Sequence, residues 1–438
     1  TLVFSNGSKG VTNLPLSGAL NVPASPPKVL ADSGFFMSGL THQKSAHQND
    51  DTHAHMLEKN WEVSAGLIRA RPVISPSADL AGFPMAMVKP LSFPPAMGAS
   101  RSWIDNFLGT PVRYNAMVEA VCPLPNGRHV VWWVDPSIVA SGIFSQEEWA
   151  IEFSRLKNAY CGRDGEDGGL AQLNTLLGDV WGVAASSYPN SIQDVPFLQD
   201  VNVVLLNVPV SSKWAGYFFG GNNLRKTSSS NSNEALALFI NASQMKADLN
   251  FSISTLLHES THMVNFYQRS IVKGVVHDTW LEETSAMMTE DIIAPAVLNG
   301  YNKVLSYRLP IYASSGGNVS YINWPTLADA SIHYAMGGGF GAFLNRRYGL
   351  SIYQQLVTGC NEEVVDSPAL TSYACLDGLI KANGGIGFSD EFARFGATVF
   401  GQLPAVGMLA GYGYPAKQAG RYQLQAGDMS LLVPESAS

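Results

Sequence analysis

The segment around residue 258 has the hydrophobic pattern of a buried helix. Apolar side chains flank a polar face on both sides, at Leu256, Leu257, Met263, Val264, Phe266 and Tyr267. That spacing is expected of a helix enclosed within a domain. Ser252 or Ser254 is the expected N-cap. A turn near residues 273–274 leaves room for a second helix.

Strand patterns precede this helix. Residues 100–136 alternate apolar and polar positions around a turn at 125–127, which predicts strands joined as a hairpin. Helical spacing follows over residues 145–160, where Ser145 and Glu148 form a capping-box pattern. The remaining upstream predictions are a helix over 169–182 and strands over 200–210 and 231–241.

After residue 291 the pattern is mainly helical. The predicted helices span 326–347, 351–357, 372–382 and 389–400, and a short β-like tail spans 421–433. An α+β fold is therefore expected, with a strand-rich upper half over residues 97–270 and a helical lower half over 271–438.

Residues 1–96 form a separate N-terminal extension in this prediction. Residues 1–40 indicate loops and edge strands, and recurring prolines over 72–99 indicate a linker. One helix is expected inside this β or irregular extension, over 56–71. The main domain is then 97–438.

Composition restricts the classes of partner. The chain has 438 residues, 46% of them hydrophobic, which is enough for a large core. Its net charge is −8 and it has no basic cluster, which argues against a nucleic-acid or anionic-membrane partner. No apolar run reaches the roughly 18 residues that a membrane helix needs.

A secreted or periplasmic location is expected. Low charge with many Ser, Asn and Gly residues suits an exported protein. The chain begins at Thr1 without a leading apolar segment, as expected after removal of a signal peptide, with or without a propeptide. A chain trimmed by design would begin in the same way.

Four cysteines are present, at Cys122, Cys161, Cys360 and Cys375. Four cysteines can form two disulfides in three ways, and one of these pairs Cys122 with Cys161 and Cys360 with Cys375. No CxxC spacing occurs, which argues against a cysteine metal site. Disulfides would fit an oxidising compartment, and four buried thiols are the alternative.

The polar face of the central helix carries His258, Glu259 and His262 in an HExxH arrangement. Residues four apart on a helix lie about 5 to 6 Å from each other, so both imidazoles can reach one zinc ion. Glu259 then faces the side where a water would sit. A short pattern of this kind also occurs by chance on solvated helices.

The third ligand distinguishes between families of zinc peptidases. A metzincin needs a histidine six residues after His262, where this chain has Gln268, so that family is excluded. Residues 280–286, WLEETSA, resemble the W-L-N-E-G-x-A segment of gluzincins. By that match Glu283 is the ligand, and Glu282 stands where Asn is usual.

Alternatives to Glu283 remain open. Glu283 could instead be an exposed carboxylate on the helix that does not bind metal. His277 and Asp278 are weaker candidates for the third ligand. Those two residues lie in the connection before the second helix.

The wider stretch is similar to the hyicolysin family of secreted neutral zinc metallopeptidases. The shared features are HExxHM-x-NF over 258–266 and W-L-x-E-x-x-S with a final Glu-Asp over 280–291. The resemblance covers roughly residues 100 to 400. It implies a thermolysin-like gluzincin domain that hydrolyses peptide bonds with a zinc-activated water, with Glu259 as general base.

The same resemblance suggests residues around the zinc. HYAMGGGFGAFL resembles the Tyr-x-x-Gly helix of aminopeptidase-type gluzincins, which makes Tyr334 the expected oxyanion donor and His333 the runner-up. Packing against the glycines is the alternative role for the tyrosine. Glu290 or Asp291 is expected to orient a ligand histidine, with a solvated position as the alternative.

Two further predictions concern ligands. The strand over 231–241 is expected either to pair with a bound peptide or to be an ordinary sheet strand. The loop over 161–169 places Asp164, Glu166 and Asp167 among glycines, so calcium is a second candidate cofactor, although the spacing is not that of an EF-hand.

The function expected from the sequence is a secreted zinc endopeptidase acting on peptides or proteins, because the GxMEN motif of aminopeptidases is absent. Aminopeptidase action is the first alternative, since other carboxylates can hold a substrate amine. A secreted binding or adhesion protein with a structural zinc is the second.

Overall fold

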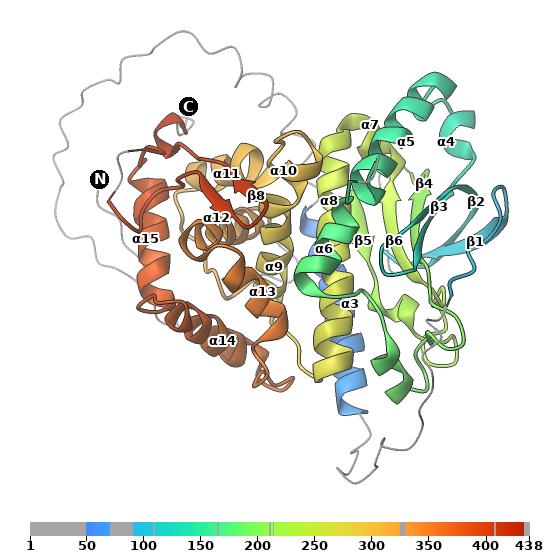
Figure 1. The fold of residues 1–438 in the computed structure, drawn as a ribbon, viewed down its shortest axis with the longest axis horizontal. Helices are drawn as coiled ribbons and strands as arrows, with labels where there is room; N and C mark the ends of the chain where they lie inside the picture. Colours follow the sequence, from blue (N-terminus) through green and yellow to red (C-terminus); the bar gives the residue numbers. More distant parts are fainter. Residues whose placement is uncertain are drawn as a thin grey trace.

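The computed structural model describes residues 50–70, 91–107, 110–163, 166–209, 212, 214–324, 330–406 and 409–432. The loops and edge strands predicted over 1–40 lie outside these residues, as does most of the predicted linker. The described chain forms a mixed α+β structure (Figure 1).

A six-stranded sheet organises the upper half, in the order β1-β2-β3-β4-β6-β5. Pairs β1/β2, β2/β3 and β5/β6 are antiparallel, whereas β3/β4 and β4/β6 are parallel. The predicted hairpin joins β2 and β3, and Gly127 adopts φ 93° in its turn. The bounds are β1 (Ser100–Asp105), β2 (Val112–Pro123), β3 (His129–Val134), β4 (Val201–Leu206), β5 (Gly216–Phe218) and β6 (Leu236–Asn241).

Of the two roles predicted for residues 231–241, the ordinary sheet strand is confirmed and the pairing with a bound peptide is not. Strand β6 is hydrogen-bonded to β4 on one side and to β5 on the other, so neither of its edges is available. The sheet edge on this side is β5. This strand has only three residues, too few for an alternating pattern to be seen in the sequence.

Both faces of the sheet are buried. Val130 and Trp132 of β3 pack on the face that meets the helices, whereas Val131 and Trp133 pack on the opposite face. Helices α5, α6 and α8 lie between the sheet and the lower half (Figure 1). The helices of the upper half are α4 (Ser137–Ala140), α5 (Gln146–Cys161), α6 (Gly169–Leu177), α7 (Ala242–Ala247) and α8 (Leu249–Asn265), with 3-10 turns η1 (Val183–Ser187) and η2 (Gly220–Asn223).

Helix α8 is the helix predicted around residue 258, but its cap differs from the prediction. Asp248 is the N-cap, and its side chain accepts a hydrogen bond from the Phe251 N–H. Ser252 and Ser254 lie inside the helix and are buried. The capping box at Ser145 and Glu148 of α5 is confirmed.

The lower half is helical, as predicted. Helix α8 continues as the π-helix η3 (Phe266–Lys273), and Gly274 ends it with φ 73°. The elements that follow are α9 (Thr279–Ile292), α10 (Ala294–Val297), η4 (Val304–Arg308), α11 (Leu309–Ser314), α12 (Ser331–Tyr348), α13 (Leu350–Thr358), α14 (Pro368–Ala382), α15 (Phe388–Phe400), the β7 (Lys417–Ala419) and β8 (Tyr422–Leu424) pair, and η5 (Met429–Leu431).

Glycines let α12 lie close to α9. A Cβ added at Gly337 would be 2.8 Å from the Met287 side chain, and one added at Gly341 would be 2.8 Å from that of Met288. The two helices therefore approach more closely than larger side chains would permit.

Helix α3 (Asp50–Arg69) belongs to the extension predicted as β or irregular, and this described part of it is helical. The helix expected over 56–71 is present and begins earlier, at Asp50. Met56 packs with Val131 and Trp133 on the sheet face away from the helices. Leu67 belongs to the core between the sheet and the helices. In the described part of the chain, no helix is both long and apolar enough to cross a membrane.

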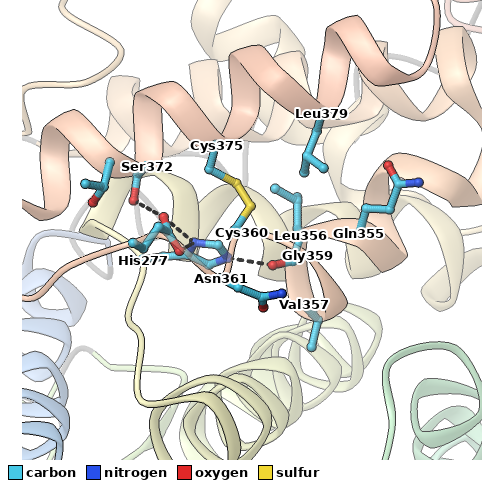
Figure 2. Close-up of a disulfide and its surroundings, with 12 residues drawn as sticks. His277, Gln355, Leu356, Val357, Gly359, Cys360, Asn361, Ser372, Cys375 and Leu379 are labelled. Atoms are coloured by element: carbon cyan, nitrogen blue, oxygen red, sulfur yellow. Dashed lines mark hydrogen bonds and ion pairs between the residues drawn. A yellow bond between two sulfur atoms is a disulfide. The ribbon is translucent and has the colours of Figure 1, made fainter.

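The structure pairs Cys122 with Cys161 and Cys360 with Cys375, which confirms the pairing within neighbouring couples. The first disulfide joins β2 to the end of α5. The second joins the loop after α13 to α14, beside Ser372 (Figure 2).

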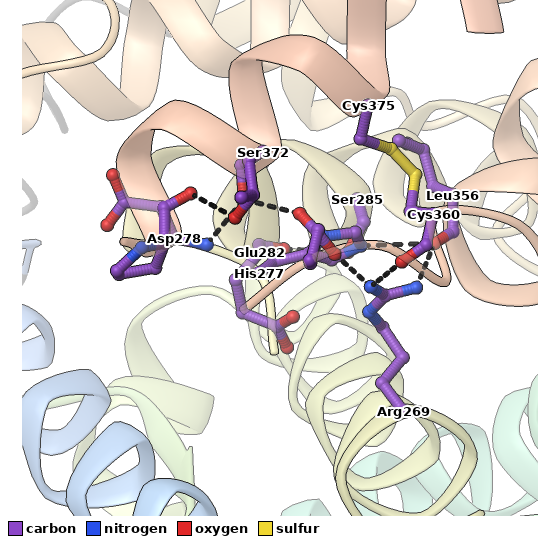
Figure 3. Close-up of polar contacts among 12 residues, drawn as sticks. Arg269, His277, Asp278, Glu282, Ser285, Leu356, Cys360, Ser372 and Cys375 are labelled. Atoms are coloured by element: carbon purple, nitrogen blue, oxygen red, sulfur yellow. Dashed lines mark hydrogen bonds and ion pairs between the residues drawn. A yellow bond between two sulfur atoms is a disulfide. The ribbon is translucent and has the colours of Figure 1, made fainter. Parts of the chain in front are cut away.

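A buried polar cluster holds the loop after α13 against η3. Arg269 of η3 donates to the Leu356 carbonyl at 2.7 Å and forms an ion pair with Glu363 (Figure 3). Glu363 also accepts a hydrogen bond from Ser372 and lies 3.0 Å from His277 Nδ1. The cluster thus connects η3, the segment just before α9, the loop after α13 and helix α14.

Candidate active site

Helix α8 places His258, Glu259 and His262 at the junction of the two halves. The two imidazole centroids are 4.8 Å apart, as expected for residues four apart on one face. All three side chains are buried, at 4%, 1% and 3% exposure. The imidazoles are therefore held in position by the packed interior.

Helix α9 brings Glu283 to the two histidines. Its Oε2 lies 3.0 Å from His258 Nε2, and its Oε1 lies 3.5 Å from His262 Nε2. One donor atom from each of the three residues falls within 4.8 Å of the others, and this is the one such group of His, Cys, Asp and Glu in the described residues.

These distances fit a single metal ion. Zinc binds nitrogen and carboxylate oxygen at about 2.0 to 2.2 Å, so donors on one ion are separated by roughly 3.3 to 3.6 Å. Two neutral imidazoles and one carboxylate are the donor set of many catalytic zinc sites, with a fourth position left for water or substrate.

The charges around the donors favour a positive occupant. Burial alone would lower the pKa of His258, but Glu283 and Glu290 outweigh it and raise that pKa. Burial likewise opposes ionisation of Glu283, yet the two histidines hold its pKa well below the usual value. A metal ion can supply the positive charge in place of protons, and its binding then releases them.

Glu290 contacts the first of the two histidines. Its Oε1 lies 3.0 Å from His258 Nδ1, while Lys303 Nζ and Arg308 Nε lie 3.3 and 2.9 Å from the same carboxylate. Such a partner fixes the orientation of the ring and leaves Nε2 directed at the metal position.

The orienting group for His262 was not predicted. Glu282 Oε1 lies 2.9 Å from His262 Nδ1, and it also accepts from the Asn265 side chain at 3.0 Å. The sequence did contain a signal, because Glu282 directly precedes the expected ligand and replaces the usual asparagine.

For Asp291 the predicted role is wrong. Its carboxylate is bound by Arg346 at 2.7 Å and by the side chains of Asn302 and Asn345, each at 2.9 Å. One residue along a helix is a rotation of about 100°, which turns Asp291 away from the side where Glu290 meets His258.

Glu259 is positioned without belonging to the three-donor group. Its Oε2 accepts a hydrogen bond from the Phe218 N–H of the edge strand β5 at 2.9 Å. A small pocket lies beside it, lined in part by Gly216, His258 and Tyr334. A carboxylate there is within reach of a reactant beside the metal position.

Tyr334 of α12 also reaches the site. Its hydroxyl donates to Glu283 Oε1 at 3.3 Å, and its ring packs against Trp324 with centroids 4.8 Å apart. The His333 ring also contacts Trp324, with the centroids 5.8 Å apart and the ring planes tilted by 55°. The close packing of the α12 glycines on α9 is what places the tyrosine next to Glu283.

The weaker candidates have other partners. His277 lies 3.1 Å from the Leu356 carbonyl and 3.0 Å from Glu363, and Asp278 caps α9 through the Thr279 N–H. In the loop predicted to bind calcium, Asp164 is outside the described residues and Asp167 pairs with Arg421 at 3.1 Å. A calcium site receives no support from these contacts.

Comparison with known proteins identifies the family. Residues 112–437 match the family model described as peptidase M30. A search of curated proteins and a search of solved structures each gave no match. The matched region covers most of the chain and includes every donor in the group above, so the chain is a peptidase, and peptides or proteins are its substrates. The chain belongs to the peptidase M30 family of metallopeptidases.

Proposed function

We propose that this chain is a zinc endopeptidase of the gluzincin type, with His258, His262 and Glu283 as the ligands. The observation that carries the proposal is the convergence of these three donors, within 4.8 Å of one another, beside the carboxylate of Glu259, which is not one of them. A closed structural zinc site would use a fourth protein ligand, whereas a catalytic site leaves one position open.

Zinc, when bound, would supply a Lewis acid that polarises the scissile carbonyl and lowers the pKa of a water toward about 7. Glu259 accepts the proton from the attacking water and passes it to the leaving amine. Tyr334 donates its hydroxyl hydrogen bond to the oxygen that becomes negative in the transition state. Glu290 and Glu282 keep the two imidazoles oriented throughout.

The edge strand offers a place for the substrate backbone. An extended peptide can add to a free sheet edge through main-chain hydrogen bonds. Strand β5 is this edge, and its Phe218 already touches Glu259. A peptide along β5 would therefore cross the site beside the metal ligands.

We further propose export to an oxidising compartment, with residues 97–438 as the catalytic domain. The two disulfides support this location, because such bonds persist mainly outside reducing compartments.

The decisive test of the mechanism uses two isosteric substitutions. Glu259→Gln should abolish hydrolysis of casein while zinc content and thermal unfolding stay close to wild type, because the amide cannot accept a proton but both imidazoles remain. Glu283→Gln should instead lower the zinc content, because a neutral amide is a poor ligand. Retention of most of the rate by Glu259→Gln at full zinc occupancy would refute the mechanism.

An amine-blocked, internally quenched peptide separates the two kinds of peptidase. Cleavage as fast as that of the free-amine form is the expected result for an endopeptidase. Cleavage of the free form alone would establish aminopeptidase action instead.

A further inference from the structure

Helix α3 precedes the region matched by the peptidase family and spans the junction between the two halves. It contacts β5 and η2 of the upper half, and η3, α9 and α12 around and below the site. The metal ligands lie on α8 and α9, so α3 passes over the elements that frame them. Among the described residues of the extension over 1–96, those of α3 reach the active site.

Along the edge strand β5, the backbone N–H and C=O groups point alternately toward β6 and away from it. Asn241 N of β6 donates to Ala215 O at 3.0 Å, and Tyr217 is opposite Phe239. Because successive residues of a strand point their amide groups to opposite sides, Phe218 directs its N–H and C=O away from β6. The N–H donates to Glu259 at 2.9 Å, and the C=O is the Phe218 group that a substrate backbone would use.

Asn60 of α3 binds this outward-facing backbone. Its Nδ2 donates to the Phe218 carbonyl at 2.8 Å, and its Oδ1 accepts from the Gly220 N–H at 2.7 Å. An asparagine carboxamide has the same donor and acceptor groups as a peptide unit. The side chain thus forms the pair of hydrogen bonds that the N–H and C=O of one residue of an added strand would form.

Other side chains of α3 occupy the adjoining space. Leu57, Trp61 and Ser64 line one pocket together with His262 and Glu282. Leu57 and Ser64 are 5% and 4% exposed, so the helix is closely seated there. The space next to the second ligand histidine is therefore partly filled by the chain itself.

We propose that α3 is a built-in inhibitor of the peptidase, in which Asn60 occupies the Phe218 C=O and the Gly220 N–H that an extended substrate needs. This inference rests on the proposed function, since it concerns access to the same site. A substrate must displace Asn60 before it can pair along β5, so the intact chain binds peptides more weakly than the site itself would.

The test compares Asn60→Ala with wild type and with Glu58→Ala, a control at an exposed position of the same helix. Loss of two competing hydrogen bonds should lower KM for a long, quenched peptide about 10-fold. The value of kcat should change little, because no group at the metal is altered. Glu58→Ala should leave KM unchanged.

Peptide binding gives a readout that does not depend on turnover. The same long peptide is titrated against Glu259→Gln and against the double variant Asn60→Ala/Glu259→Gln, with thermal unfolding as the check on folding. The double variant should bind about 10-fold more tightly. Equal KM and equal affinity in folded proteins would overturn the inhibitor role and show that Asn60 only supports the strand.

The two proposals fail in different ways. Absence of hydrolysis in the zinc-loaded wild type and in Asn60→Ala would count against the proposed peptidase mechanism, even if the affinity for the peptide changes. Hydrolysis with an unchanged KM would count against the inhibitor alone.

Discussion

The carboxylate of Glu290 lies 3.0 Å from Nδ1 of His258, and the same carboxylate is paired with two buried cations. Glu290 therefore stays ionised in a buried position and serves as a fixed acceptor for the ligand imidazole. Burial opposes its ionisation, but Arg308, Lys303 and His258 together hold its pKa well below the usual value.

Glu290→Gln should weaken zinc binding by about 10- to 100-fold, because the amide is a poorer acceptor for the His258 N–H. Zinc affinity is measured by competition with a chromophoric chelator. Asp291→Asn is the matched control, since this neighbour binds Arg346 rather than a ligand histidine. It should lower the unfolding temperature without changing the affinity. Equal losses of affinity in both variants would disprove the orienting role.

Tyr334→Phe should lower kcat by about 100-fold while KM and zinc content change little. The hydroxyl contacts Glu283 in the structure and is expected to stabilise negative charge that forms in the transition state. Steady-state kinetics on the quenched peptide measure the effect. His333→Gln is the comparison, and a larger loss of kcat in that variant would make His333 the oxyanion donor instead.

Glu363→Gln should destabilise the protein by about 3 kcal/mol at neutral pH, because it leaves the buried Arg269 without its charged partner. Thermal unfolding of the metal-free protein measures this. Glu362→Gln is the control, since it makes the same charge change at an exposed neighbouring position. Figures 2 and 3 show the surroundings of this cluster.

The effect of Glu363→Gln should depend on pH in one direction. Burial raises the pKa of the Glu363 carboxyl, but His277 and Arg269 outweigh it, so the pKa in the folded state is below the usual value. The stability that the ionised carboxylate contributes is then present above about pH 4.3 and is lost as the pH falls through the folded pKa. The two proteins should converge in stability once the pH is below the folded-state pKa of Glu363. A gap that widens in acid would contradict this.

The sequence predicted the features that depend on near neighbours. His258, Glu259 and His262 are one turn of a helix, and a buried helix could be recognised from its own hydrophobic pattern. The helices of the lower half and the β2/β3 hairpin were found for the same reason. Glu283 could be predicted as well, because it lies on the next helix along the chain.

Features that depend on distant segments were missed. Nothing local indicated that Lys303 and Arg308 would meet Glu290, because η4 reaches it only through the packing of the lower half. The edge position of β5 follows from the strand order, which a single sequence does not display. Asn60 is 158 residues from Phe218, so its contact with the edge strand had no signal in the sequence.

The order of the ligands along the chain has a consequence for assembly. His258, His262 and Glu283 come from two consecutive helices joined by the short connection after Gly274. The entropy lost on closing a loop grows with its length, so these three donors can meet before more distant segments are in place. Tyr334 is 51 residues beyond Glu283 and depends on the docking of α12. A nascent or refolding chain could thus capture its metal first, and acquire the ability to turn over substrate only when the lower half has closed.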